Sequence, residues 1–118
     1  EEETGATGGE EIMPRFLCLC QFGHSRSAAL VRILHSRGIE AVALGAGTSP
    51  SLIRDVAPLV DVIVVMQPHF ADAVPVEHRG KVVALDVGHD RWSNPYNQEL
   101  LSLVERLAIE AGFIEAKT

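Results

Sequence analysis

Short apolar segments alternate with segments of helical periodicity along this chain, and the alternation limits the folds that it can adopt. The segments with the length and apolar content of strands are 15–20, 41–44, 61–66 and 81–86. The segments predicted to be helical are 27–37, 51–57, 68–74 and the stretch that Asn94 and Pro95 begin. Because a strand, a helix and a second strand in succession usually form a parallel pair, the sequence predicts a mostly parallel sheet.

The order of these segments predicts an α/β domain with a flavodoxin-like, doubly wound sheet of four parallel strands and helices on both faces. Valine, alanine and leucine dominate the last predicted strand, 81–86, so we expect it to be buried on both faces. Ligands of such folds bind beyond the carboxyl ends of the strands, where the strand order reverses. Cys20 and Asp86 both end predicted strands, so we expect both to lie near this ligand position.

Composition limits the class of protein. With 118 residues, 47% of them hydrophobic, we expect a single globular domain over 14–118 and a disordered tail over 1–13. The tail holds five glutamates, and the rest of the chain has 11 acidic and 10 basic residues. No basic patch, membrane-length apolar run or signal peptide is evident. We therefore expect a cytoplasmic protein that binds neither nucleic acid nor membranes.

A cysteine and an arginine separated by five residues follow the first predicted strand directly, in the sequence Cys20-Gln21-Phe22-Gly23-His24-Ser25-Arg26-Ser27. A loop that leads from a strand into a helix directs backbone N–H groups and the positive end of the helix dipole at one point, which suits a phosphate. The same field favours the thiolate of Cys20, and Arg26 can bind two phosphate oxygens. The expected substrate-binding residues are Gln21, Phe22, Gly23, His24, Ser25, Ser27 and Trp92.

Several of these side chains have more than one interpretation. Ser27 can donate a hydrogen bond to the thiolate or simply cap the helix. His24 is expected to face solvent, although a contact with substrate is the alternative. Phe22, Trp92 and Tyr96 can form aromatic walls around the site or pack its loops, and for Trp92 we favour a wall because its neighbours are polar.

Taken together, these motifs resemble the low-molecular-weight protein tyrosine phosphatase superfamily, in particular its compact bacterial and phage-type members. Besides the cysteine loop, Gly45-Ala46-Gly47-Thr48 is similar to the family's Ser-Ala-Gly-Thr turn, and 61–66 with His69 is similar to its Ala-Asp-Leu-Ile-x-x-Met segment. The resemblance implies that the Cys20 thiolate attacks phosphorus and that water hydrolyses the phosphocysteine. It also implies a phosphoprotein or small aryl phosphate as substrate, with no metal or other cofactor.

A leaving alkoxide or phenolate needs a proton, so this mechanism requires a general acid on a second loop. The resemblance places the acid after the fourth strand, where the family's Asp-Pro dipeptide is missing from this sequence. We predict that Asp90 is the acid, with Asp86 and His89 as alternatives. Asp86 is more in keeping with a residue that orders the loop.

Other functions remain possible for a cysteine in such a loop. Sugar-transport IIB domains carry phosphocysteine on a similar fold, but they generally have a hydroxyl residue where this chain has Arg26. An arsenate reductase needs further thiols, and only Cys18 is present besides Cys20. We expect no disulfide between these two, because they are two residues apart on one strand. A degenerate module that binds an anion or a partner without turnover is the non-enzymatic alternative.

Overall fold

The computed structural model describes residues 14–88, 91–92 and 94–116, so the tail predicted over 1–13 lies outside the described residues. The strands and α-helices are β1 (Phe16–Cys20), α1 (Arg26–Ser36), β2 (Ala41–Gly45), α2 (Pro50–Val56), β3 (Val62–Val65), β4 (Val82–Ala84) and α3 (Gln98–Glu110). Short 3₁₀ helices complete the fold at η1 (Ala57–Leu59), η2 (Pro68–Ala73) and η3 (Val76–Lys81).

The four strands form one parallel sheet in the order β2-β1-β3-β4, which confirms the predicted fold class. The chain places β2 on one side of β1 and then crosses to place β3 on the other side. The strand order therefore reverses between β1 and β3, and the loops that follow these two strands border the usual ligand position of this architecture. Every residue of β1 is buried, so the central strand provides a rigid base for the loop that begins at Cys20.

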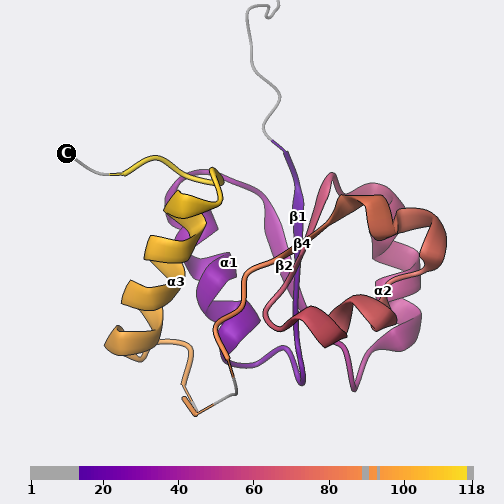
Figure 1. The fold of residues 1–118 in the computed structure, drawn as a ribbon, viewed down its shortest axis with the longest axis horizontal. Helices are drawn as coiled ribbons and strands as arrows, with labels where there is room; N and C mark the ends of the chain where they lie inside the picture. The colour runs from indigo at the N-terminus through magenta and orange to yellow at the C-terminus, as the bar shows by residue number, and fades with distance from the viewer. Residues whose placement is uncertain (1–13, 89–90, 93, 117–118) are drawn as a thin grey trace, which may run out of the picture.

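Helices cover both faces of the sheet. Figure 1 shows α1 and α3 on one face and α2 with the 3₁₀ helices on the other. Helix α1 buries Leu30 and Leu34 completely, as its apolar spacing predicts, and each such side chain contributes roughly 1.5–3 kcal/mol when it leaves water. The helix ends before Gly38, whose φ of 76° is the left-handed conformation that favours glycine after a helix.

The expectation that residues 81–86 are buried on both faces is wrong. Strand β4 has only three residues, and both Val83 and Ala84 are exposed. It is the last strand in the sheet order, and in the described part of the chain it pairs only with β3 and has no strand along its other edge. An apolar run alone does not distinguish a central strand from such an edge strand.

Helix α3 begins later than the sequence predicts. The side chain of Asn94 accepts a hydrogen bond from the backbone N–H of Tyr96 at 2.9 Å, which forms a turn there. Asn97 caps the helix, because its side chain accepts from the N–H of Leu100 at 3.1 Å. The buried stripe is Leu100, Val104 and Ala108, and Ala111, which follows the helix, is exposed.

Among the described residues, no helix combines the length and the apolar character that crossing a bilayer requires.

Candidate active site

The Cys20 sulfur lies at the start of a loop that folds back around it. Its Sγ is 3.0 Å from the hydroxyl oxygen of Ser27, and the backbone N–H of Gly23 donates to it at 3.2 Å. Cys20, Ser25, Arg26 and Ser27 are all buried. The loop is therefore closed around the sulfur, as the cysteine-to-arginine spacing predicts for an anion site.

The surroundings of Cys20 favour its thiolate. Burial alone raises the pKa of the thiol, but hydrogen bonds from the Ser27 hydroxyl and from the N–H groups of Ser27, Gly23 and Ser25 outweigh burial, so the pKa lies below its usual value. Cys18 lacks this stabilisation, and burial strongly raises the pKa of its thiol. Both cysteines are free, as expected. Of the two thiols, Cys20 is the one whose surroundings favour the thiolate.

The turn after β2 supports the loop from one side. The backbone N–H of Ala46 donates to the carbonyl oxygen of Cys20 at 2.7 Å, and that of Gly47 donates to the carbonyl of Gln21 at 2.9 Å. A Cβ atom on Gly45 would lie 2.7 Å from the carbonyl carbon of Phe22, so glycine is needed for this close approach. The turn that resembles the family's Ser-Ala-Gly-Thr segment thus lies directly against the cysteine loop.

Within the loop, Gly23 has a φ of 79°, the left-handed conformation predicted for a compact anion site. His24 is exposed, as the solvent-facing interpretation expects. The residue that caps α1 is Ser25, and its side chain makes no capping hydrogen bond. The alternative in which Ser27 caps the helix is therefore wrong, and its hydroxyl contacts the Cys20 sulfur instead.

Arg26 is almost completely buried, with 2% of its surface exposed. Its Nη1 donates to the side-chain oxygen of Gln67 at 2.6 Å and to the carbonyl oxygen of Gly88 at 2.8 Å. The guanidinium carbon lies 5.4 Å from the centre of the Phe70 ring. Among the described residues no carboxylate pairs with Arg26, and its buried Nε has no hydrogen-bond partner. A buried cation with an unused donor is suited to binding an anion.

The loop after β4 reaches Arg26 through Gly88. The Asp86 side chain accepts from the backbone N–H of Gly88 at 3.0 Å, and Gly88 has a φ of 80°. Asp86 thus orders the turn whose carbonyl oxygen holds Arg26, in agreement with the role that we favoured for it. Asp90 and His89, the other candidates for the general acid, lie outside the described residues.

The three aromatic candidates lie in different environments. Phe22 is 54% exposed in the cysteine loop, whereas Trp92 is 4% exposed and belongs to the hydrophobic core. This burial corrects the expectation that Trp92 is a wall rather than a core residue, and its contact with substrate stays a prediction. Tyr96 is exposed and lies against Arg32, whose guanidinium carbon is 4.5 Å from the ring centre.

The sequence did not point to Gln67, which is the second residue after β3 and contacts Arg26. Its place after a strand at the point where the sheet order reverses was the available signal. Met66 and Phe70 are both buried in the core, and the contact of Phe70 with the arginine was not foreseen.

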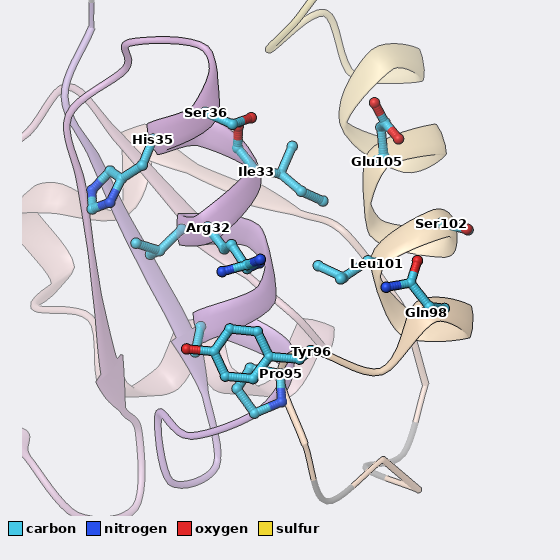
Figure 2. Close-up of a pocket in the computed structure, with 12 residues that line it drawn as sticks. Arg32, Ile33, His35, Ser36, Pro95, Tyr96, Gln98, Leu101, Ser102 and Glu105 are labelled. Atoms are coloured by element: carbon cyan, nitrogen blue, oxygen red, sulfur yellow. The ribbon is translucent and has the colours of Figure 1, made fainter.

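A groove lies away from the cysteine loop, between α1 and α3 (Figure 2). Its volume is about 750 Å³, and Arg32, Tyr96 and Glu105 are among the residues that line it. Neither Cys20 nor Arg26 does so. Its size therefore does not identify it as the reaction site, because the activated sulfur and the buried cation lie elsewhere.

In the described ranges, no cluster of three or more His, Cys, Asp and Glu side chains could hold a metal ion.

Solved structures of similar fold include two tyrosine phosphatases and a third protein, Wzb of Vibrio vulnificus. AmsI of Erwinia amylovora is 14% identical with a TM-score of 0.64, and the match covers 95% of this chain and 100% of that one. Wzb of Vibrio vulnificus, in complex with benzylphosphonate, is 19% identical with a TM-score of 0.56, covering 84% of this chain and 94% of that one. Wzb of Escherichia coli K30, in complex with phosphate, is 19% identical with a TM-score of 0.54, covering 85% and 96%.

The sequence itself matches no protein-family model and none of the curated proteins. The structural likeness nevertheless extends over nearly the whole domain and confirms the fold that the sequence motifs predicted.

Proposed function

We propose that the protein is a cysteine-dependent phosphatase that hydrolyses phosphotyrosine or small aryl phosphate esters through a phosphocysteine intermediate. The observation that carries this proposal is the pairing of an activated Cys20 sulfur with the buried Arg26 in one closed loop, where no carboxylate of the described residues neutralises the arginine. The fold shared with two tyrosine phosphatases, AmsI and the Wzb of Escherichia coli K30, supports it. The two free thiols favour a reducing compartment such as the cytoplasm.

In the first step the Cys20 thiolate attacks phosphorus, so that an S–P bond forms and the bond to the leaving oxygen breaks. Arg26 and the loop N–H groups stabilise the charge on the three equatorial oxygens, which is the main catalytic demand of phosphoryl transfer. The leaving oxygen takes its proton from the general acid. Asp90 is proposed for this role, since Asp86 already orders the turn at Gly88.

In the second step water attacks phosphorus and the S–P bond breaks, which releases inorganic phosphate. One proton of this water returns to the general acid. Cys20 leaves as a thiolate, and the hydrogen bond from Ser27 stabilises the charge that returns to sulfur. The same contact therefore favours both the attack and the departure of Cys20.

An aryl ester fits the exposed ring of Phe22 beside the loop, which can contact a flat leaving group. The complex of Vibrio vulnificus Wzb with benzylphosphonate is consistent with this choice, because that ligand carries an aromatic ring next to a phosphonate group. Among the described residues, Phe22 is the one aromatic side chain in the cysteine loop.

The buried arginine weighs against a phosphocysteine carrier, because a strongly held phosphoryl group favours hydrolysis over transfer to another protein. An arsenate reductase would need a resolving thiol, and Cys18 is a poor one because burial raises its pKa. A module that only binds anions remains the non-enzymatic alternative.

The test is steady-state hydrolysis of p-nitrophenyl phosphate at mildly acidic pH, with acid quenching to trap the phosphocysteine. We expect many turnovers per molecule and complete loss of both turnover and trapped phosphate in Cys20→Ser. A single turnover followed by a stable phosphoprotein would identify a carrier instead. Binding of phosphate without any turnover would identify the anion-binding module.

A further inference from the structure

We propose that Gln67 is a positioning residue that fixes Arg26 with its Nε directed to the phosphoryl group, and that it does so without neutralising the charge of the arginine. The inference deepens the proposed function and rests on it for the identity of the bound group. It does not depend on the choice of general acid. The side-chain contact between Gln67 and Arg26 is the observation from which it starts.

The contact uses one end of the guanidinium only. Nη1 has two N–H bonds, and both have acceptors, one at the Gln67 side-chain oxygen and the other at the Gly88 carbonyl. The Nε atom is buried and has no partner among the described residues. Because the guanidinium is planar and rigid, fixing Nη1 also fixes the direction of the Nε–H bond.

The position of Gln67 suits this role because the chain around it is held from both sides. The backbone N–H of Met66 donates to the carbonyl of Leu19 in β1 at 2.9 Å, and the N–H of Phe70 donates to the carbonyl of Gln67 at 3.1 Å. Gln67 also immediately precedes η2, and its side chain is half-buried. Its amide therefore presents an acceptor to Arg26 from a well-anchored segment.

Phe70 restricts the remaining freedom of the guanidinium. Its ring centre lies 5.4 Å from the guanidinium carbon, within the range of a cation–π contact. Gln67 and Phe70 both come from the segment after β3, so this one segment limits the rotation of the plane as well as the direction of Nη1. Gly88 supplies the second acceptor from the loop after β4.

The chemical type of the residue matters as much as its position. A carboxylate at 67 would accept the same hydrogen bond but would form an ion pair with Arg26 and add a negative charge close to a bound phosphate. A neutral amide orients the cation and leaves its charge available. Gln67→Glu and Gln67→Met separate these two contributions, because glutamate keeps the acceptor and methionine keeps the length and much of the shape.

The first measurement is the binding of inorganic phosphate by calorimetry, which needs no turnover. We expect Gln67→Met to weaken binding about tenfold and to lower kcat/KM for p-nitrophenyl phosphate about 10- to 100-fold, since misplaced groups lose much of their catalytic effect. Gln67→Glu should weaken phosphate binding about tenfold despite its intact acceptor, because it places a like charge near the anion. Gln98→Met, at the exposed start of α3, is the matched control and should leave both unchanged.

A double-mutant cycle distinguishes positioning from a general structural effect. In the Arg26→Lys background, where no planar guanidinium remains to be oriented, Gln67→Met should change phosphate affinity by less than about twofold. The proposal would be overturned if Gln67→Met lowered phosphate affinity equally in the wild-type and Arg26→Lys backgrounds. It would also be overturned if Gln67→Met kept the wild-type affinity and kcat/KM. Wild-type affinity in Gln67→Glu would overturn the claim about charge.

The failure of this inference can be told apart from the failure of the proposed function. If the wild-type protein binds phosphate but hydrolyses no ester, the phosphatase assignment fails while the binding cycle still tests Gln67. If hydrolysis is observed and the cycle shows no coupling, the phosphatase assignment stands and the role of Gln67 is refuted.

Discussion

The hydroxyl oxygen of Ser27 lies 3.0 Å from the sulfur of Cys20, and both atoms are buried at the junction between β1 and α1. Ser27 is the second residue of α1, so the start of the helix brings a backbone N–H and a hydroxyl to the sulfur at the same place. The helix therefore contributes to the acidity of Cys20 through a side chain as well as through its dipole.

Replacement of Ser27 by alanine should raise the pKa of Cys20. A hydrogen bond to a charged group is worth about 1.5–3 kcal/mol, and its loss disfavours the thiolate relative to the thiol. The rate of alkylation by iodoacetamide falls as the pH drops below the pKa of the thiol, because only the thiolate reacts. The midpoint of this profile should lie below that of free cysteine in the wild type and move upward in Ser27→Ala.

The matched control for this profile is Ser102→Ala, which removes a hydroxyl from an exposed position on α3. Its midpoint should equal that of the wild type. An unchanged midpoint in Ser27→Ala would contradict the role assigned to the hydroxyl. Cys20→Ser should abolish rapid labelling, since Cys18 is completely buried and burial raises its pKa.

Gly45→Ala should lower turnover by displacing the cysteine loop rather than by changing the overall packing. The new methyl group would lie 2.7 Å from the carbonyl carbon of Phe22, so the cysteine loop would have to shift. We expect kcat/KM for p-nitrophenyl phosphate to fall about 100-fold, as a displacement of about 1 Å can cost that much. Gly80→Ala is the control, because nothing lies within 4 Å of a Cβ atom there. Equal activity of the two variants would refute the close approach.

Asp86 should act through the hydrogen bond that it accepts from Gly88. Asn keeps a side-chain oxygen at this position and Ala does not, so Asp86→Asn should retain most of the activity and Asp86→Ala should lose about tenfold, roughly the 1.4 kcal/mol of one lost hydrogen bond. A general acid would behave differently, because Asn cannot donate the required proton.

Asp90→Asn should show the pattern expected of a missing acid. Turnover of phosphotyrosine should fall by about 10²–10⁴-fold, the usual contribution of a general acid. Turnover of p-nitrophenyl phosphate should fall less, because nitrophenol is a better leaving group. If Asp86→Asn shows this dependence on the leaving group and Asp90→Asn does not, the assignment of Asp90 is wrong.

Trp92→Ala should destabilise the domain, because this side chain belongs to the core. The expected loss in the free energy of unfolding is about 3–5 kcal/mol. Denaturation should be followed by circular dichroism, since Trp92 is the sole tryptophan and its fluorescence disappears in the variant. Tyr96→Ala, at an exposed ring, should cost less than about 1 kcal/mol. Similar stability of both variants would place Trp92 outside the core.

The sequence was sufficient to predict the parallel sheet, because the apolar periodicity of each segment indicates a strand or a helix. The order of these segments along the chain then indicates how the strands are connected. The compact loop at Cys20 was predictable for the same reason, since its residues are contiguous. The exposure of Val83 and the burial of Trp92 were not, because both depend on which elements lie next to them in space. The contact between Arg26 and Gln67 joins residues 41 positions apart, and neither residue type alone indicates it.

The buried guanidinium has a consequence for the domain as a whole. Arg26 begins α1, while the acceptors for its Nη1 follow β3 and β4, so one side chain connects the amino-terminal half of the fold to two later loops. An anion that satisfies its Nε would fasten these three parts together. The melting temperature should therefore rise with the concentration of free phosphate, which acts by mass action on the native state. Free phosphate is also the product of the phosphatase reaction proposed above, so in a cell the heat tolerance of this small protein would then follow the supply of that product.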